Sequence, residues 1–316
     1  MTQISQSAVS LFALMAGASD AHSVETVPVT FDSHGETLVG TLYLPSDYRD
    51  GDPMRAIVVT GAWTTVKEQM PATYAAALAD RGYAALAFDF RGWGESAGSP
   101  RQLENPQRKI EDIVAAARFL SGFEEIDTVG GLGICASAGY MVEASIRSDD
   151  IQAVGLVAPW LHDAAIVEAV YGGADSVASL IETGREAQAH FEATGEARMI
   201  AAASATDPTA LMQAAPYYVD PERGAIPAYV NQFNLASWEG WLTFDSLALA
   251  PRVRDPLLLV HSDAAAIPQG AHAFEAASAQ SRGVWLEGVT QFDFYDQAEA
   301  VTAASDAIAA HFDGAL

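Results

Sequence analysis

The sequence predicts an α/β fold in which helices cover both faces of a mostly parallel central sheet. Short apolar runs alternate with helical patterns along most of the chain, and one of these runs enters a helix through a tight turn. Alternation of this kind is typical of a parallel sheet between two helical layers. With 316 residues, half of them hydrophobic, the chain is long enough for one large domain with an insertion.

The predicted strands and helices follow in order along the chain. Residues 27–31 and 37–44 alternate around Ser33-His34-Gly35 and predict an opening β-hairpin. Apolar runs predict six further strands, at residues 56–60, 84–90, 128–132, 154–159, 257–260 and 284–287. Helical patterns predict helices near residues 71–81 and 110–120, after residue 136, and at 298–312. We therefore expect a central sheet of eight strands.

Residues 162–250 interrupt this alternation, because they are alanine-rich, helical in pattern and without a convincing strand run. They lie between two core strands, so we expect a helical cap over the carboxyl end of the sheet, where ligands bind in such folds. The predicted organisation is an N-terminal helix or extension at 1–24, a core at 25–161 and 251–316, and a cap at 162–250.

The amino terminus carries an apolar segment at residues 8–17 that resembles the centre of a signal peptide. The first Lys or Arg is Arg49, so the positive region that precedes such a segment is missing, and we favour a helix packed on the body. No apolar run reaches the roughly 18 residues of a membrane span, and we expect no membrane partner. A single cysteine excludes an internal disulfide, and a reactive thiol suits a reducing compartment, so we expect a cytoplasmic protein.

The formal net charge of −25 limits the classes of partner, because such an acidic chain repels phosphate backbones. We therefore expect no nucleic acid partner. No spacing of His, Cys and carboxylates is typical of a metal site, and Gly92 and Gly94 lack the third glycine of a nucleotide-binding loop. The sequence thus predicts neither a metal nor a cofactor.

Residues 129–140 predict a strand that enters a helix through a tight elbow, with Cys135 at its tip. A nucleophile on such a strained turn needs small neighbours two residues before and after it, here Gly133 and Ser137. The turn also directs the backbone N–H of Ala136 into the same space, as half of an oxyanion hole. A thiolate at Cys135 would be a nucleophile.

Two other interpretations of this segment stay open. Cys135 can be a small buried residue, because free cysteine is among the most buried residue types. A shifted register instead makes Ser137 the nucleophile. We favour Cys135, because residues 128–132 then form a strand of ordinary length that ends at the elbow. Ser137 then falls in the first helical turn, where a hydroxyl caps well.

Five segments together carry a family resemblance: the elbow at 133–137, Val66-Lys67-Glu68-Gln69 after the third strand, residues 88–96 after the fourth, 261–263 after the seventh and 291–296 after the eighth. In these segments the chain resembles the α/β-hydrolase superfamily, and within it the dienelactone-hydrolase-like branch. The resemblance covers residues 25–161 and 251–316. It implies a catalytic triad of nucleophile, imidazole and carboxylate, and it says little about the substrate, because this fold hosts many chemistries.

The resemblance also implies that the imidazole follows the eighth strand and that the acid follows the seventh or the sixth. The eighth-strand position carries Gln291, and glutamine only donates and accepts hydrogen bonds near neutral pH. Asp263 follows the seventh strand and is the candidate acid. The sequence therefore keeps the nucleophile and lacks the expected proton acceptor.

Three accounts of the missing histidine stay open. His162 leaves the sixth strand at the catalytic face and can serve as the base, with Asp163 beside it as an acid. Glu68 can hold the resting thiol, as the resemblance to dienelactone hydrolases implies for a carboxylate near the third strand. Alternatively, the site no longer hydrolyses anything and keeps Cys135 for a lyase, isomerase or binding role.

The remaining site residues are expected from two regions. The turn after the third strand should supply the second oxyanion donor, from the backbone N–H of Ala62 or Trp63. The cap and its hinge should supply substrate-binding side chains, for which the candidates are Trp160, Asp163, Tyr217 and Trp241.

The leading functional hypothesis is an enzyme that cleaves or transfers an ester, thioester or lactone acyl group through an acyl-Cys135 intermediate. One alternative is a non-hydrolytic lyase or isomerase of the same fold that uses Cys135, His162 and Gln291. Another is a catalytically silent protein that binds a small ligand. The elbow favours an enzyme, whereas Gln291 favours the two alternatives. The expected partner is a small-molecule carbonyl substrate, and a homodimer is one candidate assembly.

Overall fold

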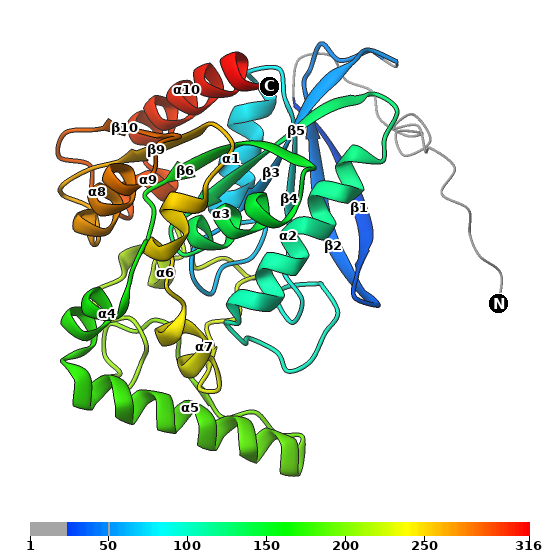
Figure 1. Cartoon of the computed structure of the whole chain (residues 1–316). Helices are drawn as coiled ribbons and strands as arrows, with labels where there is room; N and C mark the ends of the chain where they lie inside the picture. Colours follow the sequence, from blue (N-terminus) through cyan, green and yellow to red (C-terminus); the bar gives the residue numbers. More distant parts are fainter. Residues whose placement is uncertain (1–23, 50) are drawn as a thin grey trace.

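A computed structural model describes residues 24–49 and 51–316, and its centre is an eight-stranded sheet (Figure 1). The strand order is β1-β2-β4-β3-β5-β6-β9-β10. The antiparallel pairs are β1–β2 and β2–β4, and the other pairs are parallel. The strands are β1 (Glu25–Ser33), β2 (Glu36–Leu44), β3 (Met54–Thr60), β4 (Ala84–Phe88), β5 (Ile126–Ile134), β6 (Ile151–Val157), β9 (Leu257–His261) and β10 (Ser281–Trp285). The predicted fold class is confirmed.

Helices flank this sheet, as the sequence predicts. The helices α2 (Pro106–Ser121) and α3 (Ser137–Arg147) contact each other, as do α1 (Met70–Ala79) and α10 (Ala298–Ala315). Figure 1 shows α2 and α3 in front of the strands and α1 behind them. Strands β4 and β9 are buried along their whole length, because helices cover both of their faces.

The chain leaves the sheet after β6 and returns to it at β9, and we call the intervening residues 158–256 the insertion. It contains α4 (Ala164–Tyr171), α5 (Ala174–Thr194), α6 (Pro216–Val219), α7 (Ser237–Thr243) and the 3₁₀ helix η2 (Leu247–Arg252). Two very short strands, β7 (Met199–Ile200) and β8 (Phe233–Asn234), pair with each other where the sequence indicated no strand. The boundaries of a cap domain at 162–250 stay a prediction.

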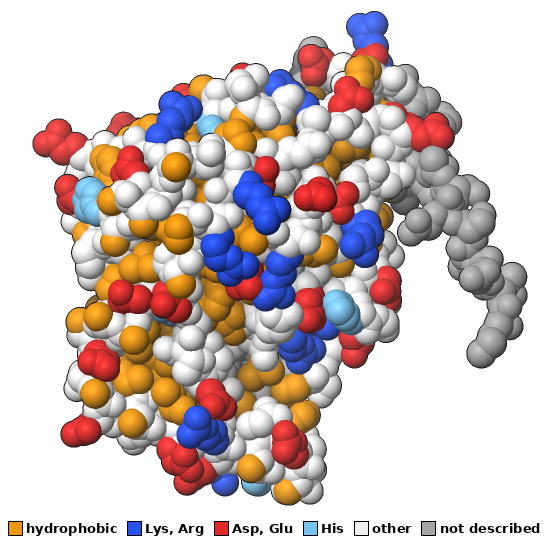
Figure 2. Space-filling view, in the orientation of Figure 1, with side chains coloured by type: hydrophobic (Ala, Val, Ile, Leu, Met, Phe, Trp, Pro, Cys, Tyr) orange, Lys and Arg blue, Asp and Glu red, His pale blue; other side chains and the backbone are white. Residues whose placement is uncertain are grey.

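Aromatic rings join the insertion to the sheet-bearing body. Trp63, from the loop after β3, stacks on Trp241 of α7 with ring centroids 4.7 Å apart. The ring of Phe233 packs edge-on against Trp63 at 5.2 Å. On the face shown in Figure 2, hydrophobic side chains gather between the upper and lower parts of the molecule, and basic side chains cluster near the centre.

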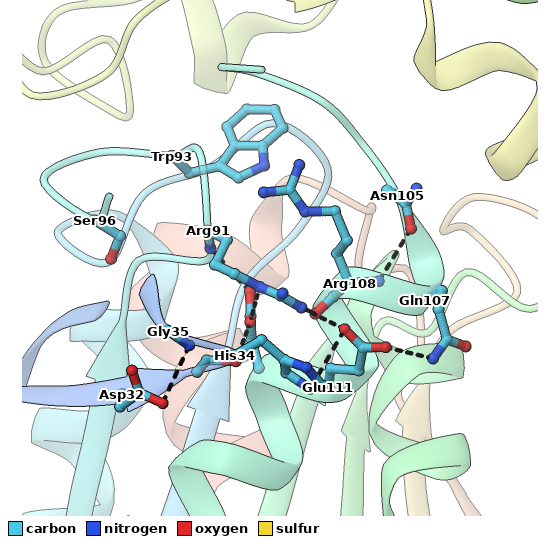
Figure 3. A network of polar contacts seen from close by, with 12 residues as sticks. Asp32, His34, Gly35, Arg91, Trp93, Ser96, Asn105, Gln107, Arg108 and Glu111 are labelled. Atoms are coloured by element: carbon cyan, nitrogen blue, oxygen red, sulfur yellow. Dashed lines mark hydrogen bonds and ion pairs between the residues drawn. The ribbon is translucent and has the colours of Figure 1, made fainter. Parts of the chain in front are cut away.

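The loop after β4 carries part of the family resemblance, and its polar residues hold the fold together. Arg91 donates to Asp112 Oδ1 at 2.5 Å and to Glu111 Oε2 at 2.6 Å, which ties the loop to α2. Figure 3 shows the ion pair between Arg91 and Glu111. Ser96 Oγ donates to the carbonyl of Asp89 at 2.5 Å and closes the loop on itself. We therefore assign these residues a structural role.

Two expectations concern the amino terminus and membranes. The predicted N-terminal helix falls on residues 1–23, which lie outside the described part of the chain. Within residues 24–49 and 51–316, no single helix is long and apolar enough to cross a membrane. The pair α4 and α5, bent by 92°, meets the requirements of length and composition only when its two helices are taken together.

Candidate active site

The elbow between β5 and α3 has the strained geometry that the sequence predicts. Cys135 adopts a positive φ of 56°, which is rare for a residue other than glycine. A Cβ on Gly133 would lie 2.7 Å from the carbonyl oxygen of Ser137 and 2.9 Å from Cα of Ala138. Only glycine therefore fits two residues before the tip, which is the steric requirement of a nucleophile elbow.

The shifted register with Ser137 as nucleophile does not agree with the hydrogen bonds. Ser137 Oγ donates to the carbonyl of Gly61 and lies 3.1 Å from the carbonyl of Ile134. The hydroxyl is buried and turned back to the loop after β3, at the beginning of α3. Ser137 thus joins two loops of the site, and Cys135 stays at the tip.

Two backbone N–H groups converge on the Cys135 thiol. They belong to Ala136, the residue after the tip, and to Trp63, in the loop after β3. Between the two candidates for the second donor, the structure brings Trp63 to the sulfur and gives no such contact for Ala62. Two donors aimed at one point, at the beginning of α3, form the arrangement that stabilises an oxyanion.

Gln291, at the position where the resemblance implies a histidine, lies next to Cys135 and interacts with its thiol. All polar atoms of its amide are engaged. Nε2 donates to the carbonyl of Ala158 at 2.9 Å and to the hydroxyl of Tyr295 at 3.1 Å. Oε1 accepts from the N–H of Ala266 at 3.1 Å. These partners fix the orientation of the amide, because a carbonyl only accepts and a backbone N–H only donates.

The environment of Cys135 favours the protonated thiol. Burial raises the pKa of the thiol, and interactions with the Tyr295 hydroxyl, the backbone N–H groups of Ala136 and Trp63, and the Gln291 amide oppose this rise in part. The residue is 7% exposed. Among the described residues, no imidazole or carboxylate interacts directly with the sulfur. The resting site therefore holds a neutral thiol at neutral pH.

His162 is buried and occupied by other partners, which argues against the expected role as base. Its Nδ1 accepts a hydrogen bond from Trp160 Nε1 at 2.9 Å, so the neutral ring carries its proton on Nε2. The backbone carbonyls of Trp241 and Phe244 lie near the ring, and its buried Nε2 forms no well-aligned hydrogen bond with the described residues. Burial lowers the pKa of His162. The ring has no free lone pair for a proton from Cys135 and instead packs the beginning of the insertion against Trp241 of α7.

Glu68 is drawn away from the thiol by its sequence neighbour. Lys67 Nζ lies 2.6 Å from Glu68, 2.9 Å from Asp89 and 2.5 Å from Glu95. These three carboxylates lie close enough together to hold a cation, and the ammonium group of Lys67 contacts all three. The expectation that Glu68 holds the resting thiol is therefore not supported.

The two candidate aspartates are also placed elsewhere. The side chain of Asp263 is 79% exposed and its Oδ1 lies 2.8 Å from His272 Nε2, at the surface. Asp163 Oδ1 accepts from the N–H of Ile166 at 2.9 Å and caps the N-terminus of α4. The structure brings neither carboxylate to Cys135, because each has a partner on its own loop or helix.

The candidate substrate-binding rings pack against one another around the site. Trp241 lies between Trp63 and His162, with ring centroids 4.7 and 4.8 Å away. Trp160 lies 6.2 Å from Trp241, and Tyr217 packs edge-on against Tyr295 at 5.2 Å. Their role in substrate binding stays a prediction.

Sequence reasoning missed the tyrosines that surround the thiol. Tyr295 interacts directly with Cys135, and Tyr140, Tyr171 and Tyr218 lie near enough for a thiolate to raise their pKa values. One signal for Tyr295 was available: it follows Gln291 by four residues, a spacing that places two side chains on one side of a helical turn.

No protein-family model matches the chain. Two relatives match over most of its length. "Uncharacterized protein YcjY" of Escherichia coli K12 is 30% identical over 291 residues, which cover 89% of this chain and 95% of the relative. "Uncharacterized protein PA2218" of Pseudomonas aeruginosa is 31% identical over 311 residues, which cover 92% and 81%.

The chain is also similar to solved structures and, over shorter stretches, to other proteins. The crystal structure of PA2218 superimposes with a TM-score of 0.80 at 27% identity, covering 100% of this chain and 99% of the other. The alpha/beta hydrolase GrgF from Penicillium sp. sh18 gives 0.76 at 17% identity, covering 91% and 99%. Acyltransferase drtE of Aspergillus calidoustus is 29% identical over 136 residues, 42% of this chain and 43% of that protein. Thiohydrolase aneE of Aspergillus aculeatus is 30% identical over 109 residues, 34% of each chain. The chain therefore belongs to one family with YcjY and PA2218 and has the α/β-hydrolase fold.

Proposed function

We propose that this protein is an acyl-transferring or hydrolytic enzyme that forms a covalent acyl-thioester on Cys135, from an ester, thioester or lactone substrate. The names of two partial relatives support the reaction class, since one is called an acyltransferase and the other a thiohydrolase. The finer assignment to Cys135 rests on this chain's own elbow.

The observation that carries the proposal is the convergence of two backbone N–H groups on a side chain held at a strained tip. Cys135 has a φ of 56°, and the N–H groups of Trp63 and Ala136 point at its sulfur. When sulfur adds to a carbonyl carbon, the oxygen becomes negative, and these two donors can stabilise it. Donors of this kind are commonly worth about 10² to 10³ in rate.

In the second half of the reaction an acceptor takes the acyl group from Cys135. The site favours transfer to another acceptor over hydrolysis by water. Water needs a general base to attack the acyl group, and among the described residues no imidazole interacts with Cys135. A thiol or an amine is a stronger nucleophile than water and depends less on such a base. We therefore place acyl transfer to a small acceptor ahead of hydrolysis.

One observation also favours the non-hydrolytic alternative. The amide of Gln291 is fixed by Ala158, Ala266 and Tyr295, as expected for a group recruited to a site and not for a remnant. A lyase or isomerase that uses Cys135 would keep this amide. It would form no stable acyl-enzyme from a simple thioester, so one experiment separates the two functions.

The test is to mix the protein with S-phenyl thioacetate, quench with acid and measure the intact mass, followed by peptide mapping. The proposal predicts one acetyl group, located on Cys135. Because the chain has a single cysteine, Cys135→Ala removes every thiol and should remain unmodified. Ser137→Ala is the matched control and should still be acetylated on Cys135.

Three results would contradict the proposal. An acetyl group on Ser137 would show that Ser137 is the nucleophile, as in the shifted register of the elbow. A protein that converts a substrate while Cys135 stays unmodified would indicate the non-hydrolytic enzyme. A protein that binds the thioester with neither modification nor turnover would indicate the silent binding protein.

A further inference from the structure

Tyr295 is the side chain whose hydroxyl reaches the Cys135 thiol. It lies on α9 (Asp293–Asp296), a short helix after β10, and is 1% exposed. Its hydroxyl interacts with the sulfur and accepts a hydrogen bond from Gln291 Nε2 at 3.1 Å. The phenol therefore stands between the thiol and the amide that occupies the histidine position.

The direction of these hydrogen bonds follows from the partners of Gln291. Because Nε2 also contacts the carbonyl of Ala158, and Oε1 accepts from the N–H of Ala266, the NH₂ group of the amide faces Tyr295. The phenol oxygen accepts from this NH₂ group, which leaves its own proton and one lone pair for Cys135. Tyr295 can thus donate to the sulfur and accept from it.

The other tyrosines near Cys135 have different partners. The hydroxyl of Tyr218 lies 3.3 Å from the carbonyl of Trp63, and that of Tyr140 lies 2.9 Å from a carboxylate oxygen of Glu104. The hydroxyl of Tyr171 accepts from the indole of Trp241 at 2.8 Å. Among the described residues, Tyr295 has the only tyrosine hydroxyl with a hydrogen bond to the sulfur.

Neighbouring rings hold the phenol in place. Tyr217 packs edge-on against the ring of Tyr295 at 5.2 Å, and Phe292 does so at 5.7 Å. Burial holds the pKa of Tyr295 far above its usual range, so the hydroxyl keeps its proton at neutral pH. A fixed, protonated phenol cannot act as a free base, but it can take one proton while it gives up another.

We propose that Tyr295 is the proton shuttle of this site and that Gln291 is the residue that positions it. The inference rests on the proposed acyl transfer. As the Cys135 sulfur bonds to the carbonyl carbon, the thiol proton moves to the Tyr295 oxygen. The phenol proton moves to the leaving group, whose bond to the carbonyl carbon breaks. Overall, the thiol and the acyl donor give acyl-Cys135 and the protonated leaving group, and Tyr295 is left unchanged.

The first experiment measures how fast S-phenyl thioacetate acylates Cys135, by intact mass, in the wild type and in Tyr295→Phe. The phenylalanine ring preserves the packing and removes only the hydroxyl. Loss of a proton-transfer group should slow acylation by about 10²-fold or more. The matched control is Tyr74→Phe, because the buried hydroxyl of Tyr74 donates to the carbonyl of Phe294 on the same helix and makes no contact with Cys135. This control should acylate at the wild-type rate.

The second experiment does not depend on acyl transfer. The rate of Cys135 alkylation by iodoacetamide is measured against pH, which gives the pKa of the thiol in each variant. The hydrogen bond from Tyr295 lowers this pKa, so Tyr295→Phe should shift the alkylation profile to higher pH. Tyr74→Phe should leave the profile in place. Gln291→Met should shift it in the same direction as Tyr295→Phe.

The double variant Tyr295→Phe with Gln291→Met tests whether the two residues act as one unit. If Gln291 works through Tyr295, the double variant should acylate no more slowly than Tyr295→Phe alone. Acylation by Tyr295→Phe within twofold of wild type would overturn the shuttle. A different result would separate the two proposals. If the alkylation profile shifts as expected between the wild type and Tyr295→Phe, but Cys135 of the wild type is never acylated, the proposed acyl transfer is contradicted and the contact between Tyr295 and Cys135 is retained.

Discussion

At the scale of single residues, two groups that interact with Cys135, the Gln291 amide and the Tyr295 phenol, do not titrate near neutral pH. Gln291 has no ionisable group, and burial keeps Tyr295 protonated because it raises the pKa of the phenol. Burial also raises the pKa of Cys135. In the proposed reaction, the chemistry of this elbow therefore depends on fixed hydrogen bonds and not on a charged pair of thiolate and imidazolium.

Gln291→His tests whether the amide is a remnant or a working part of the site. The ring cannot replace both amide contacts, to Ala158 and Ala266, so buried polar groups lose partners and acylation should fall about tenfold or more. The new imidazole should add a step between pH 5 and 8 to the pH–rate profile, which in the wild type should be flat there. Faster acylation together with this new step would show that the amide is only a lost histidine.

At the scale of elements, the elbow and the loop after β3 form the proposed oxyanion site, and each depends on one tightly packed position. Gly133 allows α3 to begin directly beneath the tip of the elbow. Lys67 fixes the other loop, because its backbone N–H and its ammonium group both bind Asp89. The backbone N–H of Trp63 is held in place between these two anchors.

Gly133→Ala should damage the elbow, because the added Cβ would meet backbone atoms of Ser137 and Ala138 at 2.7 and 2.9 Å. Overpacking of this kind costs about 1–3 kcal/mol in the free energy of unfolding, and the displaced tip should acylate more slowly. Urea unfolding and intact-mass kinetics measure the two effects. Gly314→Ala in α10, where no atom lies within 4 Å of the new Cβ, should change neither.

Lys67→Met should destabilise the protein strongly, because it leaves the fully buried side chain of Asp89 without its cation. Removing one partner of a buried ion pair costs about 3–5 kcal/mol. The double variant Lys67→Met with Asp89→Asn should recover part of this loss, since the unpaired charge is gone. Arg185→Met, which breaks an exposed pair with Glu239, should cost far less by urea unfolding. An equal loss in the free energy of unfolding in Lys67→Met and Arg185→Met would refute the argument that the buried pair matters more than the exposed one.

At the scale of the whole molecule, the fold holds several histidines in neutral form. Burial lowers the pKa values of His162, His261 and His311, and that of His261 falls to about 4. In the unfolded chain these rings bind a proton near pH 6.5. Protonation therefore favours the unfolded chain, and their contribution to stability is present above pH 6.5 and is lost as the pH falls toward 4.

His261→Asn should flatten this acid dependence. The difference between the folded and unfolded pKa of His261 corresponds to about 3 kcal/mol, lost between pH 6.5 and 4 in the wild type. The decrease in the free energy of unfolding from pH 7 to pH 4.5 should therefore be smaller in the variant. If the free energy of unfolding of His261→Asn decreased from pH 7 to pH 4.5 as much as that of the wild type, His261 would not be a source of the acid dependence.

The sequence was sufficient for the parts of the site that depend on backbone shape. The elbow and the loop after β3 follow from small residues and strand order, the position of Gln291 follows from the family resemblance, and the structure places the three near one another. The partners of charged side chains could not be predicted in this way. Lys67 draws Glu68 away, and Asp263 pairs with His272 at the surface, because such pairs depend on distances between loops.

Tyr295 illustrates the same limit for a residue that matters to the proposed chemistry. Its spacing from Gln291 was visible in the sequence, but the direction of its hydroxyl depends on the position of α9 and on the rings of Tyr217 and Phe292. His162 is the opposite case, a residue that the sequence suggested for the site and that the structure holds with another partner. Its position after β6 suggested a base, and the indole of Trp160 occupies the nitrogen that would have accepted the proton.

The most direct test of the central claim, acyl transfer through Cys135, is the time course of the acyl-enzyme during a single turnover. Excess protein is mixed rapidly with S-phenyl thioacetate and a small thiol acceptor, quenched at intervals, and analysed by intact mass together with the products. Acyl-Cys135 should form at least as fast as the steady-state turnover, precede the transferred product, and decay as that product appears. Product that accumulates while Cys135 stays unmodified, or an acyl group that forms more slowly than turnover, would contradict the account.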